Sequence, residues 1–89
     1  MEENKPIIIE MFYSFTCPNC NLMKRRLEEV LPQFGNKFEL KRSHASSPMG
    51  MIKTMKYGIH AVPALMIDKE VVFRSVPTNE ELTQKLNSY

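Results

Sequence analysis

Two cysteines, Cys17 and Cys20, flank a proline and an asparagine in the segment YSFTCPNCN, and the 89-residue chain contains no others. At this spacing a cysteine pair can be a redox-active dithiol, half of a metal site or a structural disulfide. Strand-like residues precede the pair and a helical pattern follows it, so both thiols are predicted where a strand meets a helix N-terminus. The unpaired N–H groups of a helix N-terminus favour an anion, and they lower a thiol pKa from about 8.5 to roughly 3.5–7.5. We therefore expect Cys17 to be the nucleophilic thiolate.

The second cysteine has a different predicted role. Cys20 begins an apolar stripe that continues with Met23 and Leu27 at helical spacing, so its thiol should point inward and stay mostly protonated until it reacts. In thiol–disulfide exchange the Cys17 thiolate would attack a substrate disulfide, and Cys20 would then resolve the mixed disulfide. Between the thiols, Pro18 fits the first helical turn and stiffens the loop, while Asn19 is a candidate modulator of the redox potential.

The elements that must hold the pair lie on both sides of it. KPIIIEMFYSF is rich in β-branched and aromatic residues, which predicts a central strand buried on both faces. The helix that begins at Pro18 is predicted to end near Pro32 and Gly35. Its inward stripe is predicted to comprise Cys20, Met23, Leu27, Val30, Leu31 and Phe34. KFELKRSHA predicts a second strand, and a crossover through the helix makes the two strands parallel.

The second half of the chain predicts a helix, a hairpin and a final helix. SSPMGMIKTMKYG has Ser47 as a helix cap and Gly58 as a stop signal. VPALMID and EVVFRS are separated by a short turn, which requires an antiparallel pair. TNEELTQKLNSY opens with a capping box of Thr78 and Glu81. The predicted fold is α/β with the order βαβαββα, in which three helices flank a four-stranded mixed sheet in one domain over residues 1–89.

Composition limits the classes of partner. Twelve Lys and Arg against ten Asp and Glu leave a net charge of +2, which does not favour nucleic-acid binding. The apolar run Ile7 to Ile9 is too short for a signal peptide or a membrane span. We expect a cytoplasmic monomer that binds no membrane. Small secreted scaffolds usually carry several disulfides, so a single pair of nearby cysteines favours a reactive role over a structural one.

Three segments resemble the thioredoxin and glutaredoxin superfamily over nearly the whole chain, and most closely its small prokaryotic, glutaredoxin-like members: EMFYSFTCPNC, YGIHAVPALMID and VVFRSVPTNEEL. The resemblance implies a thiol–disulfide oxidoreductase that carries electrons to disulfide-containing proteins and is recharged by a reductase. It also implies that Pro63 is a cis-proline facing the cysteines and that the Val62 backbone binds an extended substrate. Phe15 and Pro18 are predicted to contribute to the same substrate-binding surface.

The sequence departs from the superfamily pattern at several positions. Only MEENKP precedes the first predicted strand, which implies the minimal form of the fold. Thr16 replaces the tryptophan that usually precedes the first cysteine, and Met11 replaces the buried acid that assists the second thiol. Glu10 alternates to the opposite sheet face, where a structural role is predicted. The Gly-Gly and Asp arrangement that holds glutathione is missing after Pro63, so glutathione is possible but not favoured, and no cofactor beyond the redox-active disulfide is expected.

Two other readings of the cysteines stay open. One is a metal or iron–sulfur protein in which the pairs of two chains share a metal or cluster; a site within one chain would need His44 and His60, whose spacing does not favour it. The other is a binding module in which the disulfide is structural. His60 is predicted at the rim of the site as a candidate modulator, although a solvated surface position is the better expectation for both histidines.

Two further clusters receive predictions. The run Lys24 to Arg26 is expected to be the wet face of a helix with no role in the site. Met49 and Met51 are candidates for an adaptable partner surface, whereas Met55 is expected to fill the core.

Overall fold

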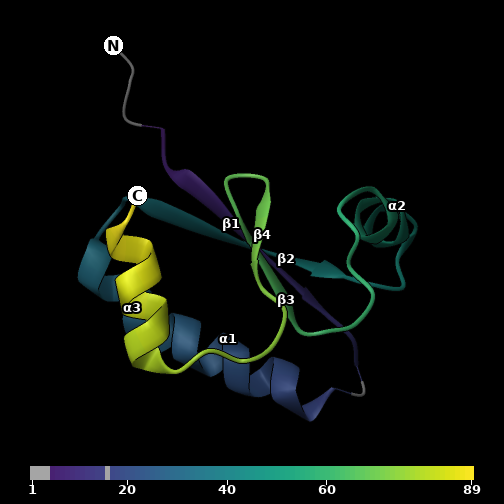
Figure 1. The fold of residues 1–89 in the computed structure, drawn as a ribbon, viewed down its shortest axis with the longest axis horizontal. Helices are drawn as coiled ribbons and strands as arrows, with labels where there is room; N and C mark the ends of the chain where they lie inside the picture. The colour runs from purple at the N-terminus through teal and green to yellow at the C-terminus, as the bar shows by residue number, and fades with distance from the viewer. Residues whose placement is uncertain (1–4, 16) are drawn as a thin grey trace.

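The computed structural model describes residues 5–15 and 17–89. Its elements form a four-stranded sheet with the order β2-β1-β3-β4 and three α-helices (Figure 1). The strands are β1 (Ile7–Tyr13), β2 (Phe38–His44), β3 (Ala64–Ile67) and β4 (Glu70–Phe73). The helices are α1 (Pro18–Val30), α2 (Pro48–Lys56) and α3 (Asn79–Asn87), and a short 3-10 helix, η1 (Leu31–Phe34), follows α1. The predicted order βαβαββα and the mixed sheet are confirmed.

Strand β1 lies inside the sheet, as its apolar sequence predicted. It pairs with β2 in parallel, with Tyr13 opposite His44, and with β3 in antiparallel fashion, with Phe12 opposite Ala64. The C-terminal ends of β1 and β2 and the N-terminal end of β3 therefore meet at one edge of the sheet. The cysteine segment leaves β1 at this edge, which we call the redox edge.

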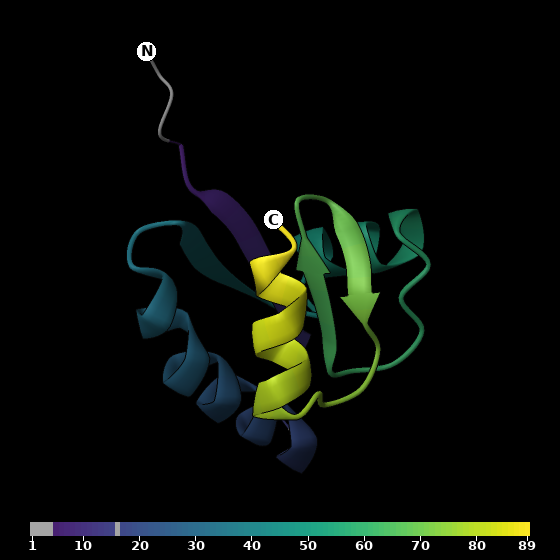
Figure 2. The ribbon, with the colours of Figure 1, turned by 60° about the vertical axis from the view of Figure 1, so that its left-hand side comes forward.

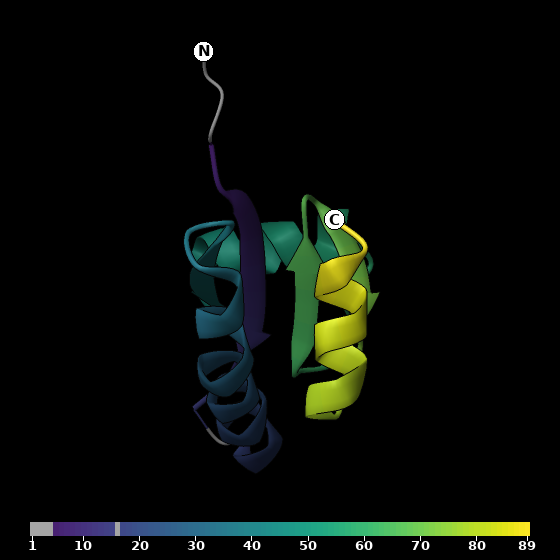
Figure 3. The same cartoon turned by 90° about the vertical axis from the view of Figure 1, so that its left-hand side faces the viewer.

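Helices cover both faces of the sheet. Figures 2 and 3 show α1 and α3 beside each other on one face and α2 on the other. The first face is the larger core, in which Ile9 and Met11 of β1 pack with side chains of both helices. The second face holds a smaller cluster of Phe12, Ile59, Ala64 and Met66. Alternation along β1 thus divides its side chains between two cores.

Most predicted helix signals are confirmed, and one boundary is wrong. Ser47 and Thr78 cap α2 and α3 through their side chains, and Thr78 forms the complete capping box with Glu81. Helix α1 ends at Val30, four residues before the predicted stripe ends at Phe34, because Pro32 cannot continue α-helical hydrogen bonding and the chain tightens into η1. Within the described part of the chain, no helix combines the length and apolarity required to cross a membrane.

The turn between β3 and β4 is made by two residues that rarely adopt its conformation. Asp68 and Lys69 have φ values of 52° and 67°, the left-handed pair that a two-residue hairpin requires. Asn and Gly are the usual occupants of such a turn, which is why its type could not be predicted from the sequence.

Helix α2 presents its apolar side chains to solvent, and this corrects the expectation for Met55. The side chain of Met55 is 82% exposed, and Gly50 is the one residue of α2 that is buried. Hydrophobic periodicity predicts which residues share a helix face, but it does not say which face turns inward. Here the inward face carries Gly50 and Lys53.

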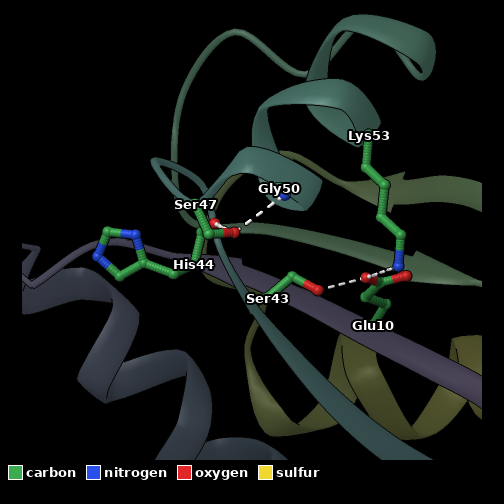
Figure 4. A network of polar contacts seen from close by, with 6 residues as sticks. All are labelled: Glu10, Ser43, His44, Ser47, Gly50 and Lys53. Carbon is green, nitrogen blue, oxygen red and sulfur yellow. Dashed lines mark hydrogen bonds and ion pairs between the residues drawn. The ribbon is translucent and has the colours of Figure 1, made fainter.

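Glu10 and Lys53 join β1 to α2 across the smaller core (Figure 4). Lys53 Nζ lies 2.8 Å from Glu10 Oε2, and the Ser43 hydroxyl donates to the same carboxylate oxygen. Glu10 is buried, so its charge needs these partners. The predicted structural role of Glu10 on the opposite face from Met11 agrees with this network.

Replacing Lys53 by methionine is expected to lower the free energy of unfolding by about 2 kcal/mol, because the Glu10 carboxylate would keep only Ser43 as a partner. Lys56→Met removes the same charge from an exposed position of the same helix and should cost at most about 0.5 kcal/mol. Urea denaturation of both variants measures the difference. Equal losses would contradict a specific role for the Lys53 and Glu10 pair.

Candidate functional site

Cys17 occupies the N-cap of α1. Its Sγ accepts a hydrogen bond from the backbone N–H of Cys20 at 3.2 Å, as a serine or threonine oxygen would at other helix caps. Pro18 is the first helical residue, which loses no hydrogen bond there because it has no N–H. The same N–H also donates to the Cys17 carbonyl oxygen at 3.2 Å, so it is shared between the two acceptors. The sulfur of Cys17 therefore lies where an N–H of the helix N-terminus can stabilise a negative charge.

The two cysteines form a disulfide, and their exposure differs. Their sulfurs are at bonding distance, with the Cα atoms 5.3 Å apart. Cys17 is half-buried, whereas Cys20 is 3% exposed and packs on the inward face of α1. Pro18 and Asn19 between them are exposed. A partner molecule can thus reach the first sulfur more readily than the second.

The loop before β3 approaches the same edge. The peptide bond between Val62 and Pro63 is cis, as the resemblance implied. Pro63 is buried and Val62 is half-buried, and Ala64 directly after them pairs with Phe12 of β1. This pairing brings the cis-proline loop to the redox edge, where the cysteine segment also begins.

Aromatic side chains line the other side of the cysteine segment. Phe15 is 87% exposed, and its ring centroid lies 4.2 Å from that of His44. The His44 ring also meets Tyr13 edge-on at 5.2 Å, and its Nδ1 accepts from the backbone N–H of Ser46. Thr16, one of the positions that differ from the superfamily pattern, lies outside the described residues.

His44 is not the solvated surface histidine that the sequence predicted. Its ring is half-buried, and its Nε2 is buried with no hydrogen-bond partner among the residues that the structure describes. Packing between Tyr13 and Phe15 causes this burial, and spacing along the chain gives no sign of it. His60 is exposed, as predicted.

A small cavity beside Cys20 brings in two cations that sequence analysis left out of the site. It has a volume of about 140 Å³, and its lining includes Cys20, Lys24 and Arg42 together with Met11 and Tyr13 of β1. Lys24 follows Cys20 by four residues, which places it one turn further along the same helix face. That spacing was the available signal, but the neighbouring Arg25 and Arg26 made the run look like an ordinary solvated face.

A second hollow runs from the redox edge to α2. It measures about 260 Å³ and lies between the segment that follows β1, the β2–α2 loop, α2 and the cis-proline loop. Its lining residues are Ser14, Ala45, Ser46, Thr54, Ile59, His60, Ala61 and Val62. His60 therefore lies beside Val62 of the cis-proline loop in the lining of this hollow.

Over residues 5–15 and 17–89, three or more His, Cys, Asp or Glu side chains nowhere converge on a point that could hold an ion.

A cysteine pair that can close a disulfide at the start of a helix, on a sheet of this order, defines a thiol–disulfide oxidoreductase with a thioredoxin fold. Comparison with known proteins identifies the family within this class. The family model described as a thioredoxin domain matches residues 7–87, so the chain belongs to the thioredoxin family.

Curated relatives agree with this assignment. The chain is 37% identical over 79 residues to a thioredoxin of Methanocaldococcus jannaschii, and this alignment covers 88% of this chain and 89% of the relative. It is 34% identical to a probable thioredoxin of Methanothermobacter thermautotrophicus, and that alignment covers 89% of this chain and 91% of the relative. Among solved structures, thioredoxin-2, a component of malaria parasite protein secretion machinery, superposes with a TM-score of 0.76. That alignment is 12% identical and covers 94% of this chain and 84% of the other, which shows the shared fold.

Proposed function

We propose that this thioredoxin-family oxidoreductase reduces protein disulfides with Cys17 as the nucleophile and Cys20 as the resolving thiol. The observation that carries the assignment is the hydrogen bond from the Cys20 N–H to the Cys17 sulfur, in combination with the burial of Cys20. A backbone donor at a helix N-terminus stabilises a thiolate, and burial in an apolar core favours a neutral thiol. The two environments therefore favour Cys17 as the nucleophile and Cys20 as the resolving thiol.

The proposed cycle begins with both cysteines reduced. The Cys17 thiolate attacks one sulfur of the substrate disulfide, whose S–S bond breaks, and the leaving sulfur departs as a thiolate that takes a proton from water. A mixed disulfide now joins Cys17 to the substrate. The Cys20 thiol loses its proton and attacks the Cys17 sulfur, which closes the Cys17–Cys20 disulfide and releases the second substrate sulfur. Two electrons have then passed from the protein to the substrate.

The cavity beside Cys20 supports a route for the proton of the second step. Met11 supplies no carboxylate there, so water in the cavity takes the proton, and Lys24 and Arg42 stabilise the thiolate that forms. Tyr13 is the other titratable group in the lining. Cations near a thiol lower its pKa, which raises the fraction of thiolate at neutral pH.

Substrate binding is proposed at the exposed surface around Cys17. Pro18 and Phe15 offer accessible apolar surface on one side, and the backbone of Val62 before Pro63 offers hydrogen bonds to an extended segment on the other. Asn19 and His60 are at positions where they would adjust the potential or the contacts with substrate. A separate reductase is proposed to return the pair to the dithiol form.

Selective alkylation of the reduced protein tests the division of roles. A limiting amount of iodoacetamide at neutral pH should modify Cys17 at least about tenfold faster than Cys20, because the helix N-terminus favours the reactive thiolate at Cys17 and Cys20 is only 3% exposed. Peptide mapping by mass spectrometry identifies the modified residue. Equal modification of both thiols, or faster modification of Cys20, would exclude Cys17 as the activated nucleophile.

Lys24→Gln is expected to slow resolution of the mixed disulfide about tenfold at neutral pH, because the thiolate that forms at position 20 loses one of the two cations in its cavity. Stopped-flow measurement of the second step across pH should show the profile shifted to higher pH, with the rates of variant and wild type converging at high pH. Arg25→Gln removes one charge from the next, exposed position and serves as the control. An equal shift in both variants would mean that only the overall charge matters.

A further inference from the structure

The apolar face of α2 is exposed although nothing in its sequence requires this orientation. Four large side chains on this helix are between 53% and 82% exposed: Met49, Met51, Ile52 and Met55. An amphipathic helix at a protein surface normally buries its apolar side. Contiguous exposed apolar surface of this kind marks an interaction site.

Two contacts hold α2 in this orientation (Figure 4). At the start of the helix, Gly50 packs against the end of β2 so closely that an added Cβ would lie 1.9 Å from the carbonyl oxygen of His44. One turn later, Lys53 is drawn inward by the Glu10 carboxylate. Rotating the helix to bury its methionines would break the ion pair and drive a side chain into the His44 backbone. The packing of α2 on the sheet therefore keeps its apolar face exposed to solvent.

The exposed face borders the hollow at the redox edge through Thr54. Thr54 of α2 lines the 260 Å³ hollow that Ser14 and Val62 line at the redox edge. The Thr54 hydroxyl donates to the carbonyl oxygen of Met51 at 2.9 Å, and Met55 is the next residue along the chain. Met51 and Met55 do not line the hollow, but they flank Thr54 on the helix and their side chains are exposed. A chain that lies in the hollow between Val62 and Thr54 would meet these two side chains where it leaves the hollow at α2.

We infer that the face formed by Met49, Met51, Ile52 and Met55 binds an apolar segment that flanks the reactive disulfide of a protein substrate. The inference rests on the exchange chemistry proposed above and adds a preference among its substrates. Methionine side chains are flexible and polarisable, so they adapt to different apolar sequences. A small disulfide reaches only Cys17 and gains nothing from α2, whereas a disulfide in an apolar stretch of protein gains contacts at both places.

The test compares three disulfides in single-turnover oxidation of the reduced protein. Two are peptides of equal length in which the disulfide is flanked by leucine and valine or by serine and glutamine, and the third is bis(2-hydroxyethyl) disulfide. The double variant Met51→Gln/Met55→Gln should raise the half-saturation concentration for the apolar peptide about tenfold and leave its maximal rate unchanged. Values for the polar peptide and the small disulfide should stay the same. Glutamine is a good helix former, so α2 should remain intact.

A matched control distinguishes docking on α2 from non-specific binding to exposed methionines. Gln84→Met/Asn87→Met places two methionines on exposed positions of α3, outside the residues that line the hollow, and should leave all three half-saturation concentrations unchanged. An unchanged half-saturation concentration for the apolar peptide in Met51→Gln/Met55→Gln would overturn the inference. The inference would also fail if sedimentation experiments showed that this double variant alters only the self-association of the protein. Wild-type protein that none of the three disulfides oxidises would instead overturn the exchange function, together with the inference that rests on it.

Discussion

A Cys20→Ser variant is expected to lose turnover of protein disulfides by at least about 10³-fold while it accumulates a mixed disulfide with its substrate. The first step needs only the Cys17 thiolate at the helix cap, and this substitution leaves its backbone donor in place because the Cys20 N–H belongs to the main chain. The second step needs a thiol at position 20. Serine is close in size and polar, so the site should keep its shape while the covalent intermediate persists.

The reciprocal Cys17→Ser variant should form no such adduct. Its remaining thiol belongs to Cys20, which is 3% exposed and lies on the inward side of α1. Non-reducing electrophoresis with a disulfide-containing protein, followed by addition of dithiothreitol, measures the adduct in both variants. Adducts of equal yield in the two variants would show that either sulfur can attack, and the assignment of roles would then fail.

A Gly50→Ala variant is expected to lose about 3 kcal/mol or more of unfolding free energy, because the new Cβ has no space at the contact between α2 and β2. Its nearest neighbour would be the His44 carbonyl oxygen at 1.9 Å, and backbone cannot move aside as a flexible side chain can. The loss should appear as a fall in midpoint temperature of roughly 15 °C in thermal unfolding.

Met49→Ala in the preceding position is the control for this loss. Met49 is exposed and alanine has the highest helix propensity, so its effect should stay within about 0.5 kcal/mol. Gly50→Ala should also move α2 and disturb the hollow at the redox edge, which would weaken binding of the apolar peptide. A Gly50→Ala protein as stable as the wild type would contradict the close packing of α2 on β2, and with it the fixed orientation of the methionine face.

Local signals predicted the framework of the site well. Ser47 and Thr78 each have a short side chain that can accept a backbone hydrogen bond, which predicts a helix start, and both caps are present. Ile9 and Phe12 belong to a strand that is apolar on both faces, which placed β1 inside the sheet. Cys17 at the end of such a strand could be assigned to a helix cap because the following residues repeat at helical spacing. These features depend on near neighbours in the chain.

The features that could not be predicted depend on contacts between distant segments. The orientation of Met55 is set by Lys53 pairing with Glu10, which lies 43 residues earlier, and by the fit of Gly50 against β2. His44 is half-buried by the rings of Tyr13, at the end of β1, and of Phe15 just after it. Lys24 joins the cavity of Cys20 only because β1 and β2 close its other sides. Periodicity describes one element at a time, so it gives no access to these arrangements.

The reduction potential of the Cys17–Cys20 couple is the most direct test of the claim that this disulfide is a redox centre. Protein is equilibrated in a series of glutathione or dithiothreitol buffers, free thiols are trapped by alkylation, and the reduced fraction is measured by mass spectrometry. We predict a single two-electron transition, in which about 30 mV changes the equilibrium constant tenfold, at a potential above about −300 mV. A pair that remains oxidised in buffers poised below about −300 mV would behave as a structural disulfide and would contradict the proposed exchange chemistry.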